Sequence, residues 1–576
     1  MVEEWKVKIL ETLTQVAKTA SECASGESKT VDSVFKITSE IGKISVVEKE
    51  PASPFPQGLM SIHQVSEWLG LSDRICVAPE ESQLPRLKTV GASSLELLYS
   101  PGGAGRRLSD VGWTLEHPYE CDVLSAQYLT KAHKAEPEVA WEEQRRVISA
   151  SLLLGHSGIA YQPGDAVGII APNRADLVAY MLARLQAAEP GVPLRANTLL
   201  RAKSEASISL QELLTYKLDL TCAPKKADVM LLSTYCSDAS GAAAMQWLCS
   251  KGEEGKALWA QVVEAQGLGL AELLHLCPSC RAPLCALYQG PDLDRMCPML
   301  PRYYSISSSP LARCGQLSIA FSVVQKTCRL TIPCVSSAAL APSIKRSGLC
   351  TSFLEQSLQP LLRGDSSAEV KVRIFHKPTA HFKLPGSAVQ PLVFIGPGTG
   401  VAPFVGFLEH RRCLEKARSG SDLTCSGVWR GSFELEEQDL PVEGTRVKDF
   451  VQSLKAGAVA LFFGCRDEND FLYEEALKAL LAEGVLTRLD VAMSRVASEK
   501  VYVQHLLLRQ GRELASSILH DGAYVYICGD GNAMARDVTK AIKQALVEHG
   551  PLSEAQAEDV ISDMKQRRRF VLDIWS

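Results

Sequence analysis

Residues 392–404 read LVFIGPGTGVAPF, and this stretch decides the fold of the C-terminal part of the chain. The apolar run LVFIG has the length of a buried strand, and the glycine-rich turn at 396–400 then opens a helical stretch. Glycines in such a turn let backbone N–H groups approach a pyrophosphate, and the helix N-terminus adds partial positive charge. Many strand–helix junctions carry glycine for steric reasons alone, and Pro403 breaks the GxGxxG spacing. The turn by itself leaves both interpretations open.

The residues that follow repeat the same alternation. Apolar runs at 458–464, 489–494 and 524–529 alternate with helical stretches. Such alternation predicts parallel strands joined by crossover helices, and therefore a doubly wound nucleotide-binding domain over residues 386–576. About 40 polar residues (418–457) separate the first helix from the second strand, which is long for such a connection. We expect them to form a disordered insertion.

Upstream, strand-like segments predict an antiparallel β-barrel over residues 119–385. A turn, YQPGD (161–165), enters one apolar strand, and RYYSISSS (302–309) begins another. Residues 172–290 show helical periodicity instead, so a helical insert is predicted to interrupt the barrel. Residues 1–118 contain short apolar runs and frequent turn residues, which is typical of a largely flexible linker.

Composition excludes several other classes of protein. The 576-residue chain has a net charge of −5, so it lacks the basic footprint of a nucleic-acid reader. It has no run of about 18 apolar residues that could span a membrane. Acidic residues near Met1 stand where a signal peptide would be basic, and 18 cysteines are scattered without a repeated spacing. We therefore expect a cytoplasmic protein with reduced thiols, and no metal at the single CxxC motif, Cys277–Cys280.

A polar cluster follows the third apolar run of the C-terminal domain. Ser494 and Arg495 end the run, and Lys500, Tyr502 and Gln504 stand where the next helix begins. A hydroxyl, a guanidinium and an ammonium group beyond strand ends suit the phosphate that NADP carries and NAD lacks. The alternative is a solvated basic helix start.

Two features near the C-terminus indicate a flat ligand. Cys528 ends the last apolar run, at the edge where open α/β sheets bind ligands, although a buried cysteine there also serves packing. Trp575 lies one residue from the end of the chain. Because terminal residues are normally polar, we expect this indole to stack on a ligand.

The predicted barrel carries a second set of candidate ligand residues. Arg302 could pair with a phosphate, Tyr304 could stack on a ring, and Ser305 could hydrogen-bond a ring nitrogen. The alternative for this stretch is an edge strand with an exposed polar face. The GLCT stretch (348–351) is a second glycine-opened helix start, suited to a second pyrophosphate. Two pyrophosphate sites in one chain indicate two dinucleotides.

Together these motifs resemble the ferredoxin–NADP reductase-like module of the diflavin reductases, over residues 119–576. The resemblance implies FAD and NADPH as cofactors and a connecting domain at 172–290. The FAD residues it implies are Arg302, Tyr303, Tyr304, Ser305, Gly348, Leu349, Cys350, Thr351 and Trp575. The NADP residues it implies are Arg145, Gly398, Thr399, Ser494, Arg495, Lys500, Tyr502, Val503, Gln504 and Asp537. The residues it implies along the hydride path are Ser305, Cys528, Asp573 and Trp575.

Within that family, three features resemble the members that reactivate cobalamin-dependent methionine synthase: the terminal DIWS, Cys350 in GLCT and PSCRAPL at 278–284. Methionine synthase is therefore the expected electron acceptor, and the microsomal cytochrome reductases are the near alternative. The family's N-terminal FMN domain is not visible in residues 1–118, so FMN is expected only if a separate or missing domain supplies it. An alternative of another class is a non-catalytic module that docks a partner.

Overall fold

The computed structural model describes nine segments of the chain: residues 53–85, 96–98, 117–131, 144–188, 199–201, 208–287, 297–329, 343–418 and 457–575. The expected insertion at 418–457 lies outside these segments except for its ends, as does most of the expected linker. Residues Pro56–Ser576 form one compact unit, which contains every predicted site residue.

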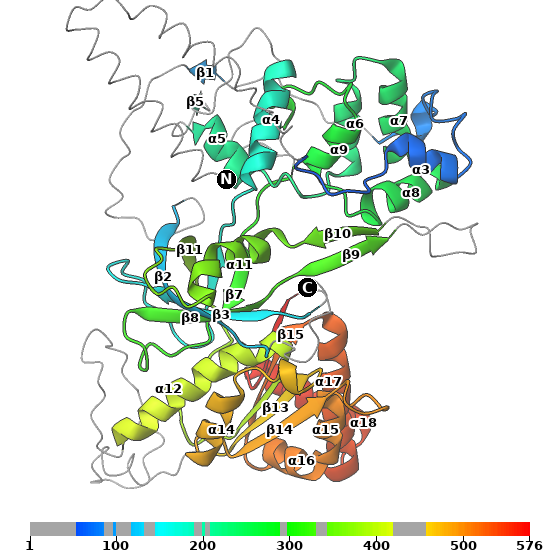
Figure 1. The fold of residues 1–576 in the computed structure, drawn as a ribbon. Helices are drawn as coiled ribbons and strands as arrows, with labels where there is room; N and C mark the ends of the chain where they lie inside the picture. The colour runs from blue at the N-terminus through cyan, green and yellow to red at the C-terminus, as the bar shows by residue number, and fades with distance from the viewer. Residues whose placement is uncertain are drawn as a thin grey trace, which may run out of the picture. The chain divides into compact units, whose positions relative to one another are not determined.

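Six antiparallel strands form the first large sheet, in the order β7-β4-β11-β2-β3-β8 (Figure 1). Their bounds are β2 (Tyr119–Tyr128), β3 (Val147–Leu153), β4 (Ala166–Ile169), β7 (Arg302–Ser305), β8 (Gln316–Ser322) and β11 (Lys371–Lys377). A bridge between Ile306 and Ile319 joins the two outer strands. Helix α11 (Leu349–Leu362) packs Leu354 and Leu358 onto the apolar interior. The antiparallel barrel that the sequence predicts is confirmed, and a hairpin of β9 (Gln325–Arg329) and β10 (Ser343–Ser347) extends from it.

Helices interrupt the barrel between β4 and β7, as predicted. They are α4 (Ala175–Ala188), α5 (Leu210–Glu212), α6 (Lys226–Ser233), α7 (Ala239–Cys249), α8 (Glu253–Trp259), α9 (Leu270–Leu276) and α10 (Leu284–Leu287). Two π-helical turns, Leu213–Lys217 and Ala260–Glu264, extend α5 and α8. Three short strands form a small sheet: β1 (Glu96–Leu98), β5 (Leu199–Arg201) and β6 (Ile208–Ser209).

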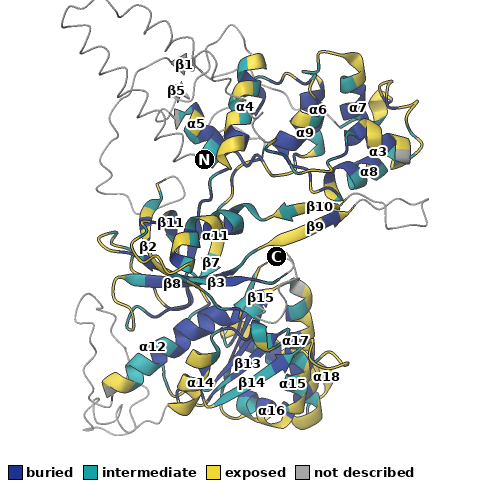
Figure 2. Ribbon diagram, viewed as in Figure 1, coloured by how far each residue is buried: buried dark blue, intermediate teal, exposed yellow. Residues whose placement is uncertain are grey.

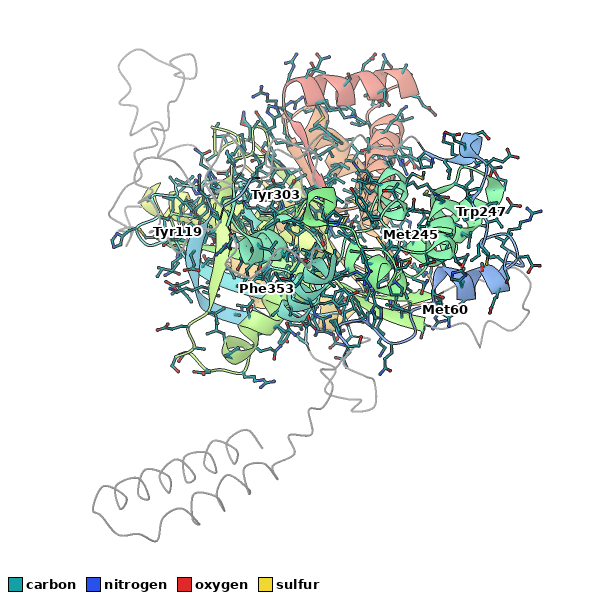
Figure 3. All side chains as sticks on the ribbon, turned by 90° about the horizontal axis from the view of Figure 1, so that it is seen from above. Met60, Tyr119, Met245, Trp247, Tyr303 and Phe353 are labelled. Carbon is teal, nitrogen blue, oxygen red and sulfur yellow. The ribbon has the colours of Figure 1, made fainter. Side chains whose placement is uncertain are left out.

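Part of the expected flexible linker packs on this helical insert instead. Helix α3 (Ile62–Trp68) begins at a serine capping box and contacts α7 and α8. The backbone N–H of Met60 donates to the Gln266 amide oxygen at 2.7 Å, and the Trp247 indole N–H donates to the Val77 carbonyl oxygen at 2.7 Å (Figure 3 labels Met60 and Trp247). Apolar side chains of the segment are buried, among them Ile62, Val65 and Ile75. Partners far along the chain therefore order a stretch whose own sequence resembles a linker.

The C-terminal sheet is parallel throughout, in the order β14-β13-β12-β15-β16. Its strands are β12 (Leu392–Pro397), β13 (Val459–Cys465), β14 (Arg488–Met493), β15 (Tyr524–Asp530) and β16 (Phe570–Trp575). Helices α12 (Ala402–Arg418) and α14 (Glu474–Ala482) pack on one face. The other face is covered by α15 (Val503–Arg509), α16 (Gly511–Leu519), α17 (Asn532–His549) and α18 (Glu554–Gln566).

Strands β13 and β15 are largely buried between these two layers (Figure 2). The doubly wound parallel sheet that the sequence predicts is thereby confirmed. Within the described segments, no helix combines the length and the apolar character needed to cross a membrane.

A buried carboxylate holds together the turn that enters β4 and the segment that leaves β11. Asp165, only 2% exposed, accepts the backbone N–H groups of Gln162 and Thr379, both at 2.8 Å. It also bonds the His376 Nε2 at 3.1 Å and the Lys383 ammonium group. Burial alone would raise the pKa of Asp165, but these hydrogen bonds outweigh burial and hold that pKa well below its usual range.

The same segment joins the barrel to the parallel sheet. The Lys383 carbonyl oxygen accepts the Tyr526 hydroxyl at 2.6 Å, and Phe382 stacks on Phe407 with ring centroids 5.4 Å apart. Gly164 has φ +90°, and a Cβ there would lie 1.8 Å from the Phe382 carbonyl oxygen. Only glycine therefore lets the YQPGD turn approach this segment so closely.

Replacing Asp165 by asparagine should destabilise the protein by about 3 kcal/mol, because Lys383 would lose its buried partner. Since the folded-state pKa of Asp165 is depressed, its contribution is complete above the unfolded-state pKa of about 4 and is lost as the pH falls below that value. Urea midpoints of wild type and D165N should therefore differ at pH 7 and converge in acid. D563N, at an exposed ion pair with Arg567, is the control and should shift the midpoint little. Equal midpoints for D165N and wild type at pH 7 would contradict the prediction.

Candidate functional site

The carboxyl ends of three parallel strands place one set of predicted residues on the same edge of the sheet. Gly398 and Thr399 follow β12, Ser494 and Arg495 follow β14, and Cys528 lies within β15 near its end. The glycine turn runs directly over β15, because a Cβ on Gly400 would lie 2.0 Å from the Cys528 carbonyl oxygen. The turn therefore needs glycine at that position, and it offers backbone groups to a ligand at this edge.

Three guanidinium groups gather beside the glycine turn. Arg145, which lies just before β3, contacts the Asp470 carboxylate at 3.3 Å. Its guanidinium group also lies against the glycine turn, because a Cβ on Gly398 would be 2.8 Å from the Arg145 Nη2. Arg466 lies 3.8 Å from the same carboxylate. Burial, and then the nearby charges of Arg495 and Arg145, lower the pKa of Arg466. Because these three cations outnumber the two carboxylates that act on Arg466, Asp470 and Asp467, the cluster fits a phosphate group.

Sequence reasoning missed Arg466. It is the first residue after β13, and a cation directly after a buried parallel strand was the available signal. Arg495, which the sequence did single out, is exposed, and the Ser494 hydroxyl donates to the Cys465 carbonyl oxygen at 3.2 Å. The exposed guanidinium group of Arg495 is therefore open to a ligand phosphate.

The residues at the start of α15 have different surroundings. Lys500 is exposed, and the Tyr502 ring is 43% exposed beside His505. Gln504 is half-buried, whereas the Val503 side chain is 2% exposed in the core of the domain. Val503 could therefore contact a ligand only through its backbone. Asp537 lies exposed on the second turn of α17.

The barrel contributes a second glycine-built helix start. Gly348 is the N-cap of the 14-residue α11, and a Cβ there would lie 2.8 Å from Thr351 Oγ1 and 2.9 Å from Val324 Cβ. The Tyr304 hydroxyl bonds the Cys350 sulfur at 3.3 Å, and burial raises the pKa of that thiol to about 11. Leu349 packs against the barrel core. The helix N-terminus thus offers backbone N–H groups, which fit a pyrophosphate.

Two further residues of β7 precede Tyr304 in the strand. Arg302 is exposed, donates to the Leu300 carbonyl oxygen at 2.6 Å and lies 3.8 Å from the Asp219 carboxylate. Its guanidinium group is open to a ligand phosphate. The Tyr303 ring instead meets Phe375 of β11 edge to face, with centroids 6.1 Å apart. The structure therefore does not bring Tyr303 together with Cys350 and Tyr304.

The barrel and the parallel sheet meet at Asp573. Its carboxylate accepts the Ser305 hydroxyl from β7 at 3.0 Å and the Cys528 thiol from β15 at 3.6 Å. Burial raises the pKa of Asp573, although both hydrogen bonds act in the opposite direction. Burial, and then the charge of Asp573, raise the pKa of the Cys528 thiol well above its ordinary value. Trp575, two residues beyond Asp573 on β16, is 37% exposed. A hydroxyl, a neutral thiol and a carboxyl group thus meet at one junction.

Comparison with known proteins agrees with this division into two cofactor domains. Residues 114–331 match the family model of the FAD binding domain, and residues 394–540 match that of the oxidoreductase NAD-binding domain. The matched domains and the two folds account for FAD and NADPH as cofactors. The glycine-built helix starts and the guanidinium cluster provide the anion-binding groups that two dinucleotides require.

Complete relatives are longer than this chain. Methionine synthase reductase of Bos taurus is 33% identical over 450 residues, which cover 73% of this chain and 57% of that protein. The Homo sapiens enzyme of the same name is 30% identical over 458 residues, with coverages of 75% and 58%. NADPH–cytochrome P450 reductase of Homo sapiens is 32% identical over 444 residues, with coverages of 75% and 56%. The chain therefore spans a little over half the length of these relatives.

Adding a methyl group at Gly348 should weaken FAD binding, because the new Cβ would press on Thr351 and Val324 at the helix N-terminus. We expect the dissociation constant of FAD to rise at least about tenfold in G348A, which corresponds to about 1.4 kcal/mol. The flavin-to-protein ratio after gel filtration and flavin fluorescence titration measure it. The matched control is G386A, whose Cβ would meet open space. Wild-type FAD affinity in G348A would rule out pyrophosphate binding at this helix.

Proposed function

Since this chain belongs to the diflavin reductase-like family, as its two cofactor domains and its relatives show, we propose that it supplies electrons for the reactivation of methionine synthase. Its membership of the family makes it an NADPH-dependent flavoprotein reductase. The acceptor, the route through FMN and the role of each site residue are part of the proposal.

One observation supports the hydride step above all others. Ser305 and Cys528 come from different sheets, yet both donate to the same Asp573 carboxylate, at 3.0 and 3.6 Å. A reductase must bring a coenzyme held by one domain against a flavin held by the other. The two domains contribute polar groups to one carboxylate, and this is where we expect the coenzyme and the flavin to meet.

The proposed FAD residues bind through charge and stacking. Arg302 would pair with a phosphate, Tyr304 would stack on a ring, and the backbone N–H groups of Gly348–Thr351 would hold the pyrophosphate. FAD, when bound, takes up the hydride from NADPH and can release its electrons one at a time. The exposed indole of Trp575 would cover one face of the flavin and must move aside before the nicotinamide can stack there.

The proposed NADP residues lie along the strand ends. Ser494, Arg495 and Lys500 would hold the 2′-phosphate, since Ser494 and Arg495 directly follow β14 and Lys500 stands shortly before α15. The set proposed for the rest of the coenzyme is Arg145, Gly398, Thr399, Tyr502, Val503, Gln504 and Asp537. We add Arg466 to this set because it shares Asp470 with Arg145.

The junction residues would orient the reaction and stabilise charge. Because burial raises its pKa, the Cys528 thiol keeps its proton at neutral pH, and it would pack as a neutral group against the reacting carbon. The Ser305 hydroxyl holds one Asp573 oxygen in place at 3.0 Å. From there the carboxylate would stabilise the positive charge that develops on the nicotinamide as the hydride leaves.

The acceptor can be tested with FMN domains taken from two relatives. We expect this chain with NADPH to reduce ferricyanide unaided, because a small oxidant can reach an exposed flavin. With the FMN domain of methionine synthase reductase added, it should restore turnover of inactivated cobalamin-dependent methionine synthase. The FMN domain of NADPH–cytochrome P450 reductase is the matched control and should not do so. Cytochrome reduction with the second domain, and no methionine synthase turnover with the first, would overturn the proposed acceptor.

A further inference from the structure

Two cysteines outside the cofactor site lie against each other at the base of β7. Cys222 is exposed and follows the π-helical turn Leu213–Lys217, whereas Cys297 is 6% exposed and precedes β7. The Cys297 thiol lies 3.5 Å from the Cys222 carbonyl oxygen, and the two thiols are close enough for each to shift the pKa of the other. The fold therefore brings two cysteines together although 75 positions separate them in the sequence (297 − 222).

Backbone hydrogen bonds fix this arrangement. The segments that carry the two cysteines form an antiparallel bridge between Leu218 and Pro298. Asp219 bonds both cysteine backbones: its N–H donates to the Cys297 carbonyl oxygen at 2.8 Å, and its carbonyl oxygen accepts the Cys222 N–H at 3.3 Å. Main-chain hydrogen bonds thus fix the positions of the two cysteines relative to each other.

Cys297 also holds an unusual backbone conformation. Its φ is +49°, in the left-handed region that side chains other than glycine rarely adopt. Residues held there by the surrounding structure cluster at functional sites. Here the residue in that conformation is the one whose thiol lies against the Cys222 carbonyl oxygen.

The two thiols differ in reactivity. The hydrogen bond from Cys297 lowers the pKa of Cys222 to about 7, and the positive charge of Arg302 acts in the same direction against burial and Asp219. An exposed cysteine with a lowered pKa attacks disulfides readily, and a thiol directly behind it can resolve the product. Cys222 is the exposed member of this pair and Cys297 the buried one.

We propose that Cys222 and Cys297 form a reversible intramolecular disulfide when the protein meets a small disulfide such as oxidised glutathione. The Cys222 thiolate attacks one sulfur of the small disulfide, forms a mixed disulfide and releases one thiolate. Cys297 then gives up its proton and attacks the Cys222 sulfur, which breaks the mixed disulfide and releases the second thiolate. The protein pair loses two electrons and two protons, and one small disulfide becomes two thiols.

This bond would form next to the predicted FAD strand. Asp219, which bonds both cysteines, lies 3.8 Å from the Arg302 guanidinium through its carboxylate. A disulfide at this point would tie the loop of Asp219 covalently to the segment that leads into β7. The proposal needs neither hydride transfer nor a particular electron acceptor, so it stands or falls separately from the proposed function.

Peptide mapping of the full chain tests the proposal. The folded protein is exposed to oxidised glutathione, its remaining thiols are alkylated, and it is digested without a reductant for mass spectrometry. We expect a linked peptide pair that joins residues 222 and 297 and disappears on treatment with dithiothreitol. In C297S, glutathione should stay attached to Cys222, because the resolving thiol is gone. In C314S, which removes another exposed cysteine, the link should form as in wild type.

The wild-type map decides the question even if a variant fails to fold. A stable glutathione adduct on Cys222 without the link would overturn the proposal, because Cys297 would then be unable to resolve it. An unmodified Cys222 beside a modified Cys314 would overturn it as well, because the attacking thiolate would be absent.

Discussion

The buried carboxylate of Asp165 is the interaction on which the arrangement of the site depends. It gathers His376 near the end of β11, and Thr379 and Lys383 from the segment between the two sheets, onto the turn that enters β4. The Lys383 carbonyl oxygen then accepts the Tyr526 hydroxyl, which comes from the central part of the parallel sheet. An unpaired carboxylate could not remain buried there, so the charge forces this segment into one conformation.

A second contact between the sheets lies four residues beyond Ser305. The Ser309 N–H donates to the Glu409 carboxylate at 3.1 Å, and the Ser309 hydroxyl bonds the His410 ring at 3.0 Å. Burial lowers the pKa of His410 to about 4, so this ring is neutral at physiological pH. Helix α12 therefore holds the chain just after β7. The position of Ser305 relative to Asp573 depends on these contacts as well as on the hydrogen bond between the two residues.

The sequence predicts the elements better than their long-range contacts. Alternating apolar and helical runs suffice for a parallel sheet, and a parallel sheet gathers its strand ends on one edge, so the glycine turn and Arg495 could be found together. The packing of the segment around α3 could not be predicted from its own sequence, because its partners Gln266 and Trp247 lie far along the chain. Arg466 has no motif of its own. Because successive side chains of a strand point to opposite faces, the sequence of β7 already predicts that Tyr303 and Tyr304 face different surroundings.

The central claim is that the strand ends hold NADPH by its 2′-phosphate and deliver its hydride to FAD, and anaerobic bleaching of the bound flavin measures both parts. Wild type should bleach with NADPH at far lower concentrations than with NADH. In R495A the NADPH concentration for half-maximal rate should rise about 10- to 100-fold, as loss of a charge-assisted phosphate bond implies. NADH should be unaffected, and R412A, at an exposed ion pair with Glu483, should behave as wild type. A flavin that neither coenzyme bleaches, or equal losses for both in R495A, would contradict the account.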